Sequence, residues 1–447
     1  MTKAAHPIGF IAIARPTFDV PLAHEKTALA RKNLGTAGFS LLGPQDLVMD
    51  SDSIQAAIAL FKQQYPPLIV VFQASFADST MVSHLAQEMD VPLFLWAIPE
   101  ERTGGRLRLN SFCGINLAGH GLHRAGIHYE YAYAAPDDPS AIAKITAISR
   151  AAEVKQRLQQ ARIGRIGENP AGFDTCLFDP DKLRNLIGLE VVQINLEQVF
   201  DSARNADPQA VAEIETQLHQ QISGMDKVDA EETRGTLRTY LTLKDMAQEQ
   251  NLHGIAVRCW PEFFTDLGCS ACGAMSMMTD HYTPCSCEAD VNGTITQLIL
   301  QWLSDQPAFG TDMVDFDTES DTAILWHCGL APLSMADPDS IPEAALHSNR
   351  QKPLLMQFPL KPGQITIARL SEASGEMRLV VGRGQMLQAP PAFSGTSGTV
   401  RFDSGTQSVM DTILREGLEH HISITYGDHT EALLALARLL GIPVLIL

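Results

Sequence analysis

The sequence predicts an α/β protein with two Rossmann-like, doubly wound domains followed by a mainly β C-terminal domain. Two observations lead to this prediction. Up to about residue 285, short apolar runs alternate with amphipathic helical patterns, which is typical of parallel sheets covered by helices. From about residue 320, strand-like runs follow one another with few helices between them, which favours an antiparallel sheet or a barrel.

The first domain is expected at residues 1–150. Its apolar runs read as buried parallel strands at positions 8–14, 39–42, 68–72 and 92–96. Helical patterns separate these runs at positions 22–34, 53–64 and 79–89. The segment Ala-Ala-Pro-Asp-Asp-Pro at 134–139 has the composition of a linker, and it precedes a predicted helix at 139–161.

The second and third domains are expected at residues 151–285 and 286–447. The second has predicted strands at 163–166, 190–194 and 254–259, with long helices at 208–222 and 230–250. Strands of the third are predicted at 322–328, 353–358, 364–370 and 377–381. A helix at 408–415, a strand opening at the pair His420-His421, a helix at 430–440 and a strand at 443–447 close the chain.

Composition excludes several classes of function. The net charge of −19 argues against a nucleic-acid partner, because phosphate backbones are bound by clustered Lys and Arg. No run approaches the ~20 apolar residues of a membrane span. The N-terminus lacks a secretory signature. Eight cysteines in 447 residues are not a disulfide framework, so we expect a reduced, cytoplasmic protein.

Four residues from distant segments suggest a metal site. Glu262 follows a predicted strand in Cys-Trp-Pro-Glu-Phe, Asp290 precedes a helical pattern in Glu-Ala-Asp-Val-Asn-Gly, and His420 and His421 open a strand. Two carboxylates and an imidazole suit a divalent ion such as Mn²⁺ and leave positions for a polyhydroxy substrate. Alone, Glu262 reads as a surface residue and Asp290 as a helix N-cap. Neighbours on a strand face opposite ways, so at most one histidine should reach the cleft.

Two further clusters carry weaker signals. His327, in Leu-Trp-His-Cys-Gly, is either a semi-buried packing residue or a further site histidine. Cys269-x-x-Cys272 followed by Cys285-x-Cys287 resembles a structural zinc pattern, but the two pairs are close together and the second spacing is unusual. The sequence favours thiols in a loop beside the active site.

Spaced motifs over most of the chain resemble the L-fucose isomerase and L-arabinose isomerase superfamily. The segments that carry this resemblance are 95–101 (Leu-Trp-Ala-Ile-Pro-Glu-Glu), 105–114 (Gly-Arg-Leu-Arg-Leu-Asn-Ser-Phe-Cys-Gly), 172–174 (Gly-Phe-Asp), 326–329 (Trp-His-Cys-Gly) and 440–444 (Leu-Gly-Ile-Pro-Val). Glu262, Asp290 and the histidine pair stand in the order and spacing of the superfamily's metal-binding residues.

The resemblance implies a fold, an activity and a set of site residues. The fold is two Rossmann-like domains and a β-barrel-like domain. The activity is that of an aldose–ketose isomerase, usually Mn²⁺-dependent, in a trimer or hexamer whose subunits share active sites. Glu262, Asp290 and His421 match the metal ligands, and the two acids match the catalytic residues. The substrate-contacting candidates are Arg15, Trp96, His327 and His420. The chain is shorter than typical fucose isomerases and has a cysteine-rich loop, which suggests another sugar, such as one whose anionic group binds Arg15 or Arg108.

The implied reaction moves a proton between C1 and C2 of a sugar through a cis-enediol. One carboxylate would take the proton and the other would shuttle protons between oxygens. Two other functions fit the same residues: a cytoplasmic sugar-binding protein without turnover, built like a two-lobed solute-binding protein, and a metal-dependent sugar epimerase or aldolase.

Overall fold

A computed structural model describes residues 6–447 and divides into two compact units, Met1–Gln156 and Arg157–Leu447. The first unit contains a five-stranded parallel sheet in the order β2-β1-β3-β4-β5. Its strands are β1 (His6–Ile13), β2 (Phe39–Leu42), β3 (Ile69–Gln73), β4 (Leu93–Ala97) and β5 (Tyr129–Tyr133). Its helices are α1 (Val20–Thr36), α2 (Ser51–Gln64), α3 (Thr80–Glu88), α4 (Ser111–Arg124) and α5 (Pro139–Leu158).

The first sheet has the doubly wound arrangement that the sequence predicts. Strands β3 and β4 are buried along their whole length, as expected for the centre of a parallel sheet. The strand order reverses between β1 and β3, and ligands of such sheets bind where the order reverses, at the carboxyl ends of the strands. Arg15 lies two residues beyond the end of β1, at this edge.

The second unit begins with a four-stranded parallel sheet in the order β7-β6-β8-β9. These strands are β6 (Arg162–Ile166), β7 (Glu190–Ile194), β8 (Gly254–Val257) and β9 (Cys285–Ser286). The helices of this part are α6 (Pro180–Ile187), α7 (Leu196–Arg204), α8 (Pro208–Gln221), α9 (Ala230–Glu249), α10 (Glu262–Thr265), α11 (Cys272–Asp280) and α12 (Val291–Ser304).

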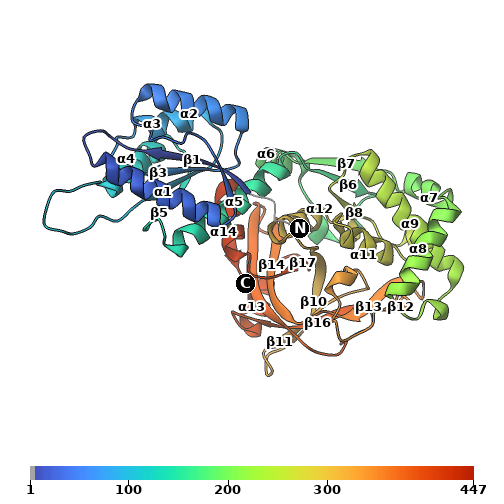
Figure 1. The fold of residues 1–447 in the computed structure, drawn as a ribbon. Coiled ribbons are helices and arrows are strands. Elements are labelled where there is room, and N and C mark those ends of the chain that lie inside the picture. The colour runs from blue at the N-terminus through green and yellow to red at the C-terminus, as the bar shows by residue number, and fades with distance from the viewer. Residues whose placement is uncertain (1–5) are drawn as a thin grey trace. The chain divides into compact units, whose positions relative to one another are not determined.

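Helix α12 joins this sheet to the rest of the second unit. It contacts β8 and β6 on one side and β17 and β14 on the other (Figure 1). Thirteen of its fourteen residues, from Val291 to Leu303, are buried, so its apolar residues are not confined to one face. The N-terminus of α12, with its N-cap Asp290, is therefore held deep inside the unit.

The remaining strands form a closed barrel. Strands β16, β11, β10, β17, β14 and β15 pair antiparallel in that cyclic order, because β15 also pairs with β16. Their bounds are β10 (Phe309–Asp317), β11 (Thr322–His327), β14 (Gly363–Ser371), β15 (Arg378–Leu387), β16 (Thr396–Phe402) and β17 (His421–Tyr426). Closure leaves the six strands without a free edge.

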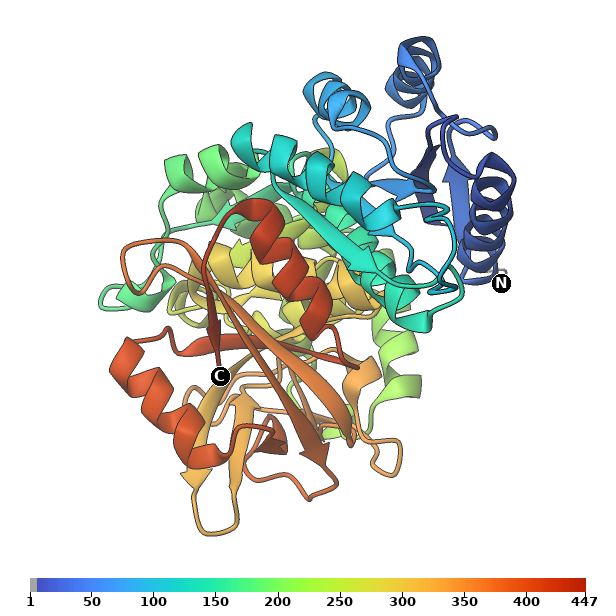
Figure 2. The ribbon, with the colours of Figure 1, turned by 90° about the vertical axis from the view of Figure 1, so that its left-hand side faces the viewer.

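Three short strands and two helices complete the barrel region. Strands β12 (Glu343–Ala345) and β13 (Leu355–Pro359) extend the sheet beside β16, and β18 (Val444–Ile446) pairs with β15. Helices α13 (Thr406–Glu416) and α14 (Thr430–Leu440) are the red helices beside the orange and red strands in Figure 2.

The predicted fold class is confirmed: two parallel α/β sheets precede a six-stranded antiparallel barrel. The sequence patterns missed α4, β5, β10 and β16, whose residues mix polar and apolar types. They also missed the helices α6, α7 and α11 and the short strands β9 and β12. The boundaries at 150 and 285 stay predictions. One hydrophobic core runs from Ile166 in the second sheet to Leu447 after the barrel. Within residues 6–447, no helix is long and apolar enough to cross a membrane.

Candidate active site

One group of residues in the described part of the chain has the geometry of a metal site. It consists of Cys176, Glu288, His420 and His421, and the potential ligand atoms lie within 4.8 Å of one another. Cys176 lies in a short 3₁₀ turn after β6, and Glu288 lies in another turn between β9 and α12. His421 is the first residue of β17, and His420 directly precedes it. Residues far apart in the sequence thus converge inside the second unit.

Glu288 is held between an indole and an imidazole. Its Oε1 accepts a hydrogen bond of 3.1 Å from Nε1 of Trp260, and its Oε2 lies 3.1 Å from Nε2 of His420. Glu288 has a φ of 59°, and Ala289 has a φ of 55°. Non-glycine residues adopt this left-handed region at an energetic cost, often at functional sites. The sequence reasoning missed Glu288, although it stands two residues before Asp290.

His421 lies between the two acids of this segment. Its Nδ1 is 3.0 Å from Oδ2 of Asp290, and its Nε2 is 3.9 Å from Oε2 of Glu288. Burial disfavours the imidazolium, but the hydrogen bond with Asp290 and the nearby acidic groups outweigh it and raise the pKa of His421 well above its ordinary value. The ring is therefore oriented by Asp290.

Asp290 is fully buried, and its two carboxylate oxygens contact different groups. Its Oδ1 accepts the backbone N–H of Gly293 at 2.8 Å, which caps α12, and its Oδ2 faces Nη1 of Arg369 at 2.6 Å. Burial alone would raise the pKa of the Asp290 carboxyl, but the charges of Arg369 and His421 hold it below its ordinary value. The N-cap expectation is confirmed, and the same side chain also reaches His421.

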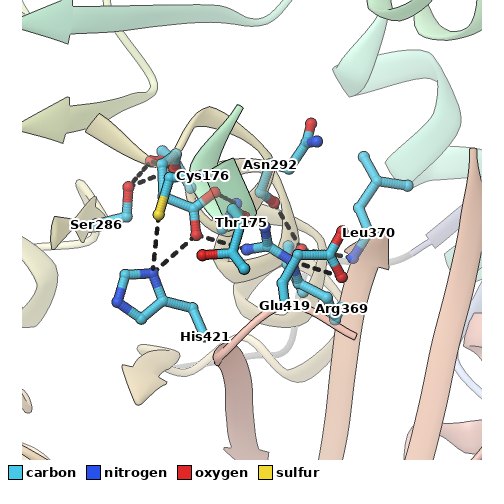
Figure 3. Close-up of polar contacts among 12 residues, drawn as sticks. Thr175, Cys176, Ser286, Asn292, Arg369, Leu370, Glu419 and His421 are labelled. Atoms are coloured by element: carbon cyan, nitrogen blue, oxygen red, sulfur yellow. Dashed lines mark hydrogen bonds and ion pairs between the residues drawn. The ribbon is translucent and has the colours of Figure 1, made fainter. Parts of the chain in front are cut away.

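Arg369 is a fully buried cation that the sequence reasoning did not select. It lies on β14, donates to Asp290 and to the carbonyl oxygen of Thr175 at 3.3 Å, and its Nε is 3.9 Å from Oε2 of Glu419. Figure 3 shows Arg369 between Thr175 and Glu419. An arginine within an apolar strand pattern signals a buried acidic partner, and that signal is present in Ile-Thr-Ile-Ala-Arg-Leu.

Both histidines of the pair enter the same site, so the expectation that only one could do so is wrong. Their ring centroids are 4.0 Å apart, and both belong to the metal-competent group. Strand β17 begins at His421, so His420 lies before the strand. The alternation of side chains along a strand therefore does not force the two histidines to opposite faces. His420 Nδ1 lies 2.7 Å from the Thr175 hydroxyl, and its ring is 5.9 Å from that of Phe173.

Glu262 lies on the loop after β8 and is engaged by an arginine. Both of its carboxylate oxygens accept hydrogen bonds from Arg258, at 2.7 to 3.0 Å. These hydrogen bonds lower the pKa of the Glu262 carboxyl. Trp260, two residues earlier, links this loop to Glu288. Glu262 is not a member of the metal-competent group, and its assignment as a metal ligand stays a prediction.

His327 lies at the end of β11, behind His421. It is buried, its ring centroid is 5.9 Å from that of His421, and its Nδ1 accepts the backbone N–H of Cys328 at 2.9 Å. Burial lowers the pKa of His327 well below its ordinary value, so the ring is neutral. It packs beside the site, and direct contact with a substrate stays a prediction.

Arg15 and Trp96 belong to the first unit. Arg15 forms an ion pair with Asp78 and lines a cavity of about 410 Å³ together with residues of α2 and α3. Trp96 is fully buried in the sheet, and its Nε1 donates to the carbonyl oxygen of Ala134 at 3.0 Å. This contact is that of a packing residue. Substrate contacts by Arg15 and Trp96 stay predictions.

The cysteines do not form the zinc pattern. None of Cys269, Cys272, Cys285 and Cys287 belongs to the one metal-competent group among residues 6–447. The expectation that all are thiols is also wrong, because Cys287 forms a disulfide with Cys259. Sequence spacing could not reveal this pair, since β8 and β9 become neighbours only in the folded sheet. Cys269, Cys272 and Cys285 are buried free thiols.

The charges around the group fit a divalent cation. Glu288, Asp290 and Glu419 contribute three carboxylates, and Arg369 is the cation that pairs with two of them. Buried carboxylates in excess are stabilised by a bound metal ion. Imidazole and carboxylate donors suit borderline divalent ions, whereas the Cys176 thiol is a softer donor. Burial raises the pKa of the Cys176 thiol.

Comparisons with known proteins give the family of the chain. A model for the N-terminal domain of fucose/sulfoquinovose isomerases matches residues 9–159, and one for the C-terminal domain of L-fucose isomerases matches residues 325–447. A sulfoquinovose isomerase from Alkalicoccus urumqiensis is 29% identical over 439 residues, which cover 97% of this chain and 98% of that protein. Another from Priestia megaterium is 28% identical over 437 residues, 97% of each chain.

Solved structures add nothing to these matches. An ABC transporter solute-binding protein from Burkholderia multivorans covers 68% of this chain and 95% of its own, with 11% identity and a TM-score of 0.18, which carries no weight. The two domain matches, the full-length relatives and the fold together show that the chain is an enzyme of the fucose/sulfoquinovose isomerase family, a sugar aldose–ketose isomerase.

Proposed function

We propose that this enzyme is a divalent-metal-dependent aldose–ketose isomerase that acts on sulfoquinovose through a cis-enediol. The observation that carries the metal-dependent chemistry is the convergence of Glu288, His420 and His421 within 4.8 Å beside a buried, ionised Asp290. The choice of substrate rests on the full-length relatives, which are named sulfoquinovose isomerases. Sulfoquinovose is a sulfonated aldose, in line with the anionic sugar expected from the sequence.

Glu288, His420 and His421 would hold the cation. When bound, a divalent ion such as Mn²⁺ polarises neighbouring sugar oxygens and stabilises negative charge that develops on them. Asp290 orients the His421 ring through Nδ1, and Arg369 holds Asp290 in place. Such supporting carboxylates fix the tautomer of a ligating histidine. The sequence-based assignment of Asp290 and Glu262 as direct ligands stays a prediction.

We assign the transfer of the sugar proton to Glu262. Its side chain is about a quarter exposed, at 27%, whereas that of Asp290 is fully buried, at 0%. A group that exchanges a proton with carbon must reach the substrate. Arg258 keeps Glu262 ionised, so it is ready to accept the proton from C2 and return it to C1.

Recognition of the sulfonate is assigned to the first unit. Arg15 and Arg108 each form an ion pair with an aspartate, Asp78 and Asp19 respectively. A planar guanidinium binds a tetrahedral oxyanion with directional hydrogen bonds. We propose that Arg15 or Arg108, together with Trp96 of the same unit, serves the active site of a neighbouring subunit in a cytoplasmic homo-oligomer, a trimer or a hexamer.

One experiment tests the proposal directly. Metal-free enzyme is supplied with Mn²⁺, Co²⁺ or Zn²⁺ and with sulfoquinovose, L-fucose or D-mannose in deuterated water, and the products are followed by NMR. We expect a ketose from sulfoquinovose, with deuterium from the solvent entering at C1 of that ketose. Binding without turnover, a C2 epimer as the sole product, or carbon–carbon cleavage would each reject the proposal.

A further inference from the structure

Asp312 is an acidic residue of the barrel with no function assigned above. In the pairing of β10 with β17, Asp312 stands directly opposite His421, so both side chains project from the same face of the sheet. Its Oδ1 atom is buried and has no hydrogen-bond partner among the described residues. The nearest basic atom is Nε2 of His421, at 3.6 Å, which is too far for a hydrogen bond.

The two nitrogens of His421 face different groups. Nδ1 lies 3.0 Å from Asp290, so Nε2 is the ring nitrogen that would meet a metal. Two carboxylate oxygens face Nε2: Oδ1 of Asp312 at 3.6 Å and Oε2 of Glu288 at 3.9 Å. Donors that share one cation through bonds of about 2.0–2.3 Å lie roughly 3–4 Å apart. These separations are too long for hydrogen bonds and fit a shared ion.

Charge supports the same interpretation. An ionised oxygen that is buried without a partner is unfavourable unless a cation meets it. Asp312 and Glu288 approach the same nitrogen, so they also repel each other in the metal-free protein. The side chain of Asp312 is 23% exposed although its Oδ1 atom is buried, so the residue borders space open to solvent.

We propose that Asp312 is a further ligand of the divalent cation, bound together with Glu288 on the Nε2 side of His421. The inference rests on the proposed metal dependence. The Cys176 sulfur lies 3.9 Å from Nδ1 of His421 and 3.7 Å from Oε2 of Glu288. Asp312 adds a further oxygen donor to the site, which favours Mn²⁺ over a thiophilic ion.

The affinity for Mn²⁺ tests the proposed function of Asp312 independently of turnover. Mn²⁺ is titrated calorimetrically into the metal-free full-length enzyme, into Asp312→Asn and Asp312→Ala, and into Asp315→Asn as the matched control. Asp315 is an exposed carboxylate on the same strand. We expect the Asp312 variants to bind Mn²⁺ roughly 100-fold more weakly, since even supporting residues of metal sites change affinity by about 10–100-fold. Asp315→Asn should bind like the wild type.

Thermal unfolding of the same proteins distinguishes a ligand from a structural residue. Without metal, Asp312→Asn should melt at a temperature equal to or above that of the wild type, because an unpaired charge is removed. With Mn²⁺, the wild type should gain more in melting temperature than the variant. This reversal requires a cation at Asp312. If the Asp312 carboxylate were purely structural, Asp312→Asn would lower the melting temperature both with and without Mn²⁺.

The outcomes separate this inference from the proposed function. Wild-type Mn²⁺ affinity in both Asp312 variants would overturn the role of Asp312 and leave the metal-dependent isomerase intact. A wild-type protein that binds none of the divalent ions would overturn both. An equal loss of Mn²⁺ affinity in Asp315→Asn would overturn the role of Asp312, since the effect would then follow from the charge of the strand in general.

Discussion

The loops that follow β8 and β9 each carry an acid of the candidate site, yet the two carboxylates have different surroundings. Glu262, after β8, is held by both hydrogen-bonding arms of Arg258. Glu288, after β9, meets an indole N–H and an imidazole. An acid already paired with an arginine is a poor metal ligand, whereas one that faces an indole and an imidazole is available to a cation. The two acids therefore suit different tasks.

The two loops are nevertheless tied together. Trp260 of the first donates to Glu288 of the second, and Cys259 is bonded to Cys287. Each residue of these links stands within three positions of one of the acids. The loop that presents Glu262 and the loop that presents Glu288 are thus positioned as one element, as the proposed division between proton transfer and metal binding requires.

The largest effect is expected from Glu288→Gln. The variant keeps the hydrogen bond from Trp260 but loses a charged ligand, so Mn²⁺ affinity should fall by at least ~100-fold and kcat/KM by roughly 10³-fold or more. Calorimetric titration and steady-state kinetics measure the two quantities. Unchanged Mn²⁺ affinity would show that the cation binds elsewhere and would remove the contrast between the loops.

Glu262→Gln should affect turnover alone. Loss of a group that transfers protons lowers kcat by about 10²–10⁴-fold, while Mn²⁺ affinity stays within a few-fold of the wild type because Glu262 lies outside the ligand group. The variant also keeps its fold, as checked by circular dichroism. A joint loss of metal affinity and turnover would instead support the sequence-based assignment of Glu262 as a ligand.

The disulfide between the loops should contribute stability. Cys259 and Cys287 are 28 positions apart in the sequence, and cross-links that close loops of this size stabilise proteins by about 3 kcal/mol. We expect Cys259→Ser and Cys287→Ser to lower the urea midpoint by similar amounts, and a reductant to do the same to the wild type. Cys113→Ser, which removes an exposed free thiol, is the control and should change nothing. A wild type insensitive to reductant would contradict the cross-link.

The sequence revealed the fold more fully than the site. Parallel strands and the barrel follow from local hydrophobic patterns, so the fold class could be predicted. Asp290 and the histidine pair were selected because their residue types favour metals. Cys176 and Asp312 are also residue types that bind metals, but nothing in the local sequence places them beside His421. Their proximity arises from a turn after β6 and from strand register. The direction of His420 depended on where β17 begins.

A smaller effect is expected from a substitution beside the buried Asp290–Arg369 pair. Gly293 lies against the Asp290–Arg369 pair, and an added Cβ would stand 2.5 Å from Oδ2 of Asp290 and 3.1 Å from Nη1 of Arg369. Gly293→Ala should therefore displace this buried pair and cost about 1–3 kcal/mol of unfolding free energy, with a modest loss of Mn²⁺ affinity through the misplaced His421 ring.

Gly35 provides the matched control, because it is also helical and its added Cβ would meet nothing within 4 Å. Gly35→Ala should raise stability by up to about 1 kcal/mol, since alanine favours a helix over glycine. Urea denaturation measures the change in unfolding free energy, which should be negative for Gly293→Ala and positive for Gly35→Ala. If Gly293→Ala were as harmless as Gly35→Ala, the Asp290–Arg369 pair would have room to move, and Asp290 would be too loosely held to orient His421.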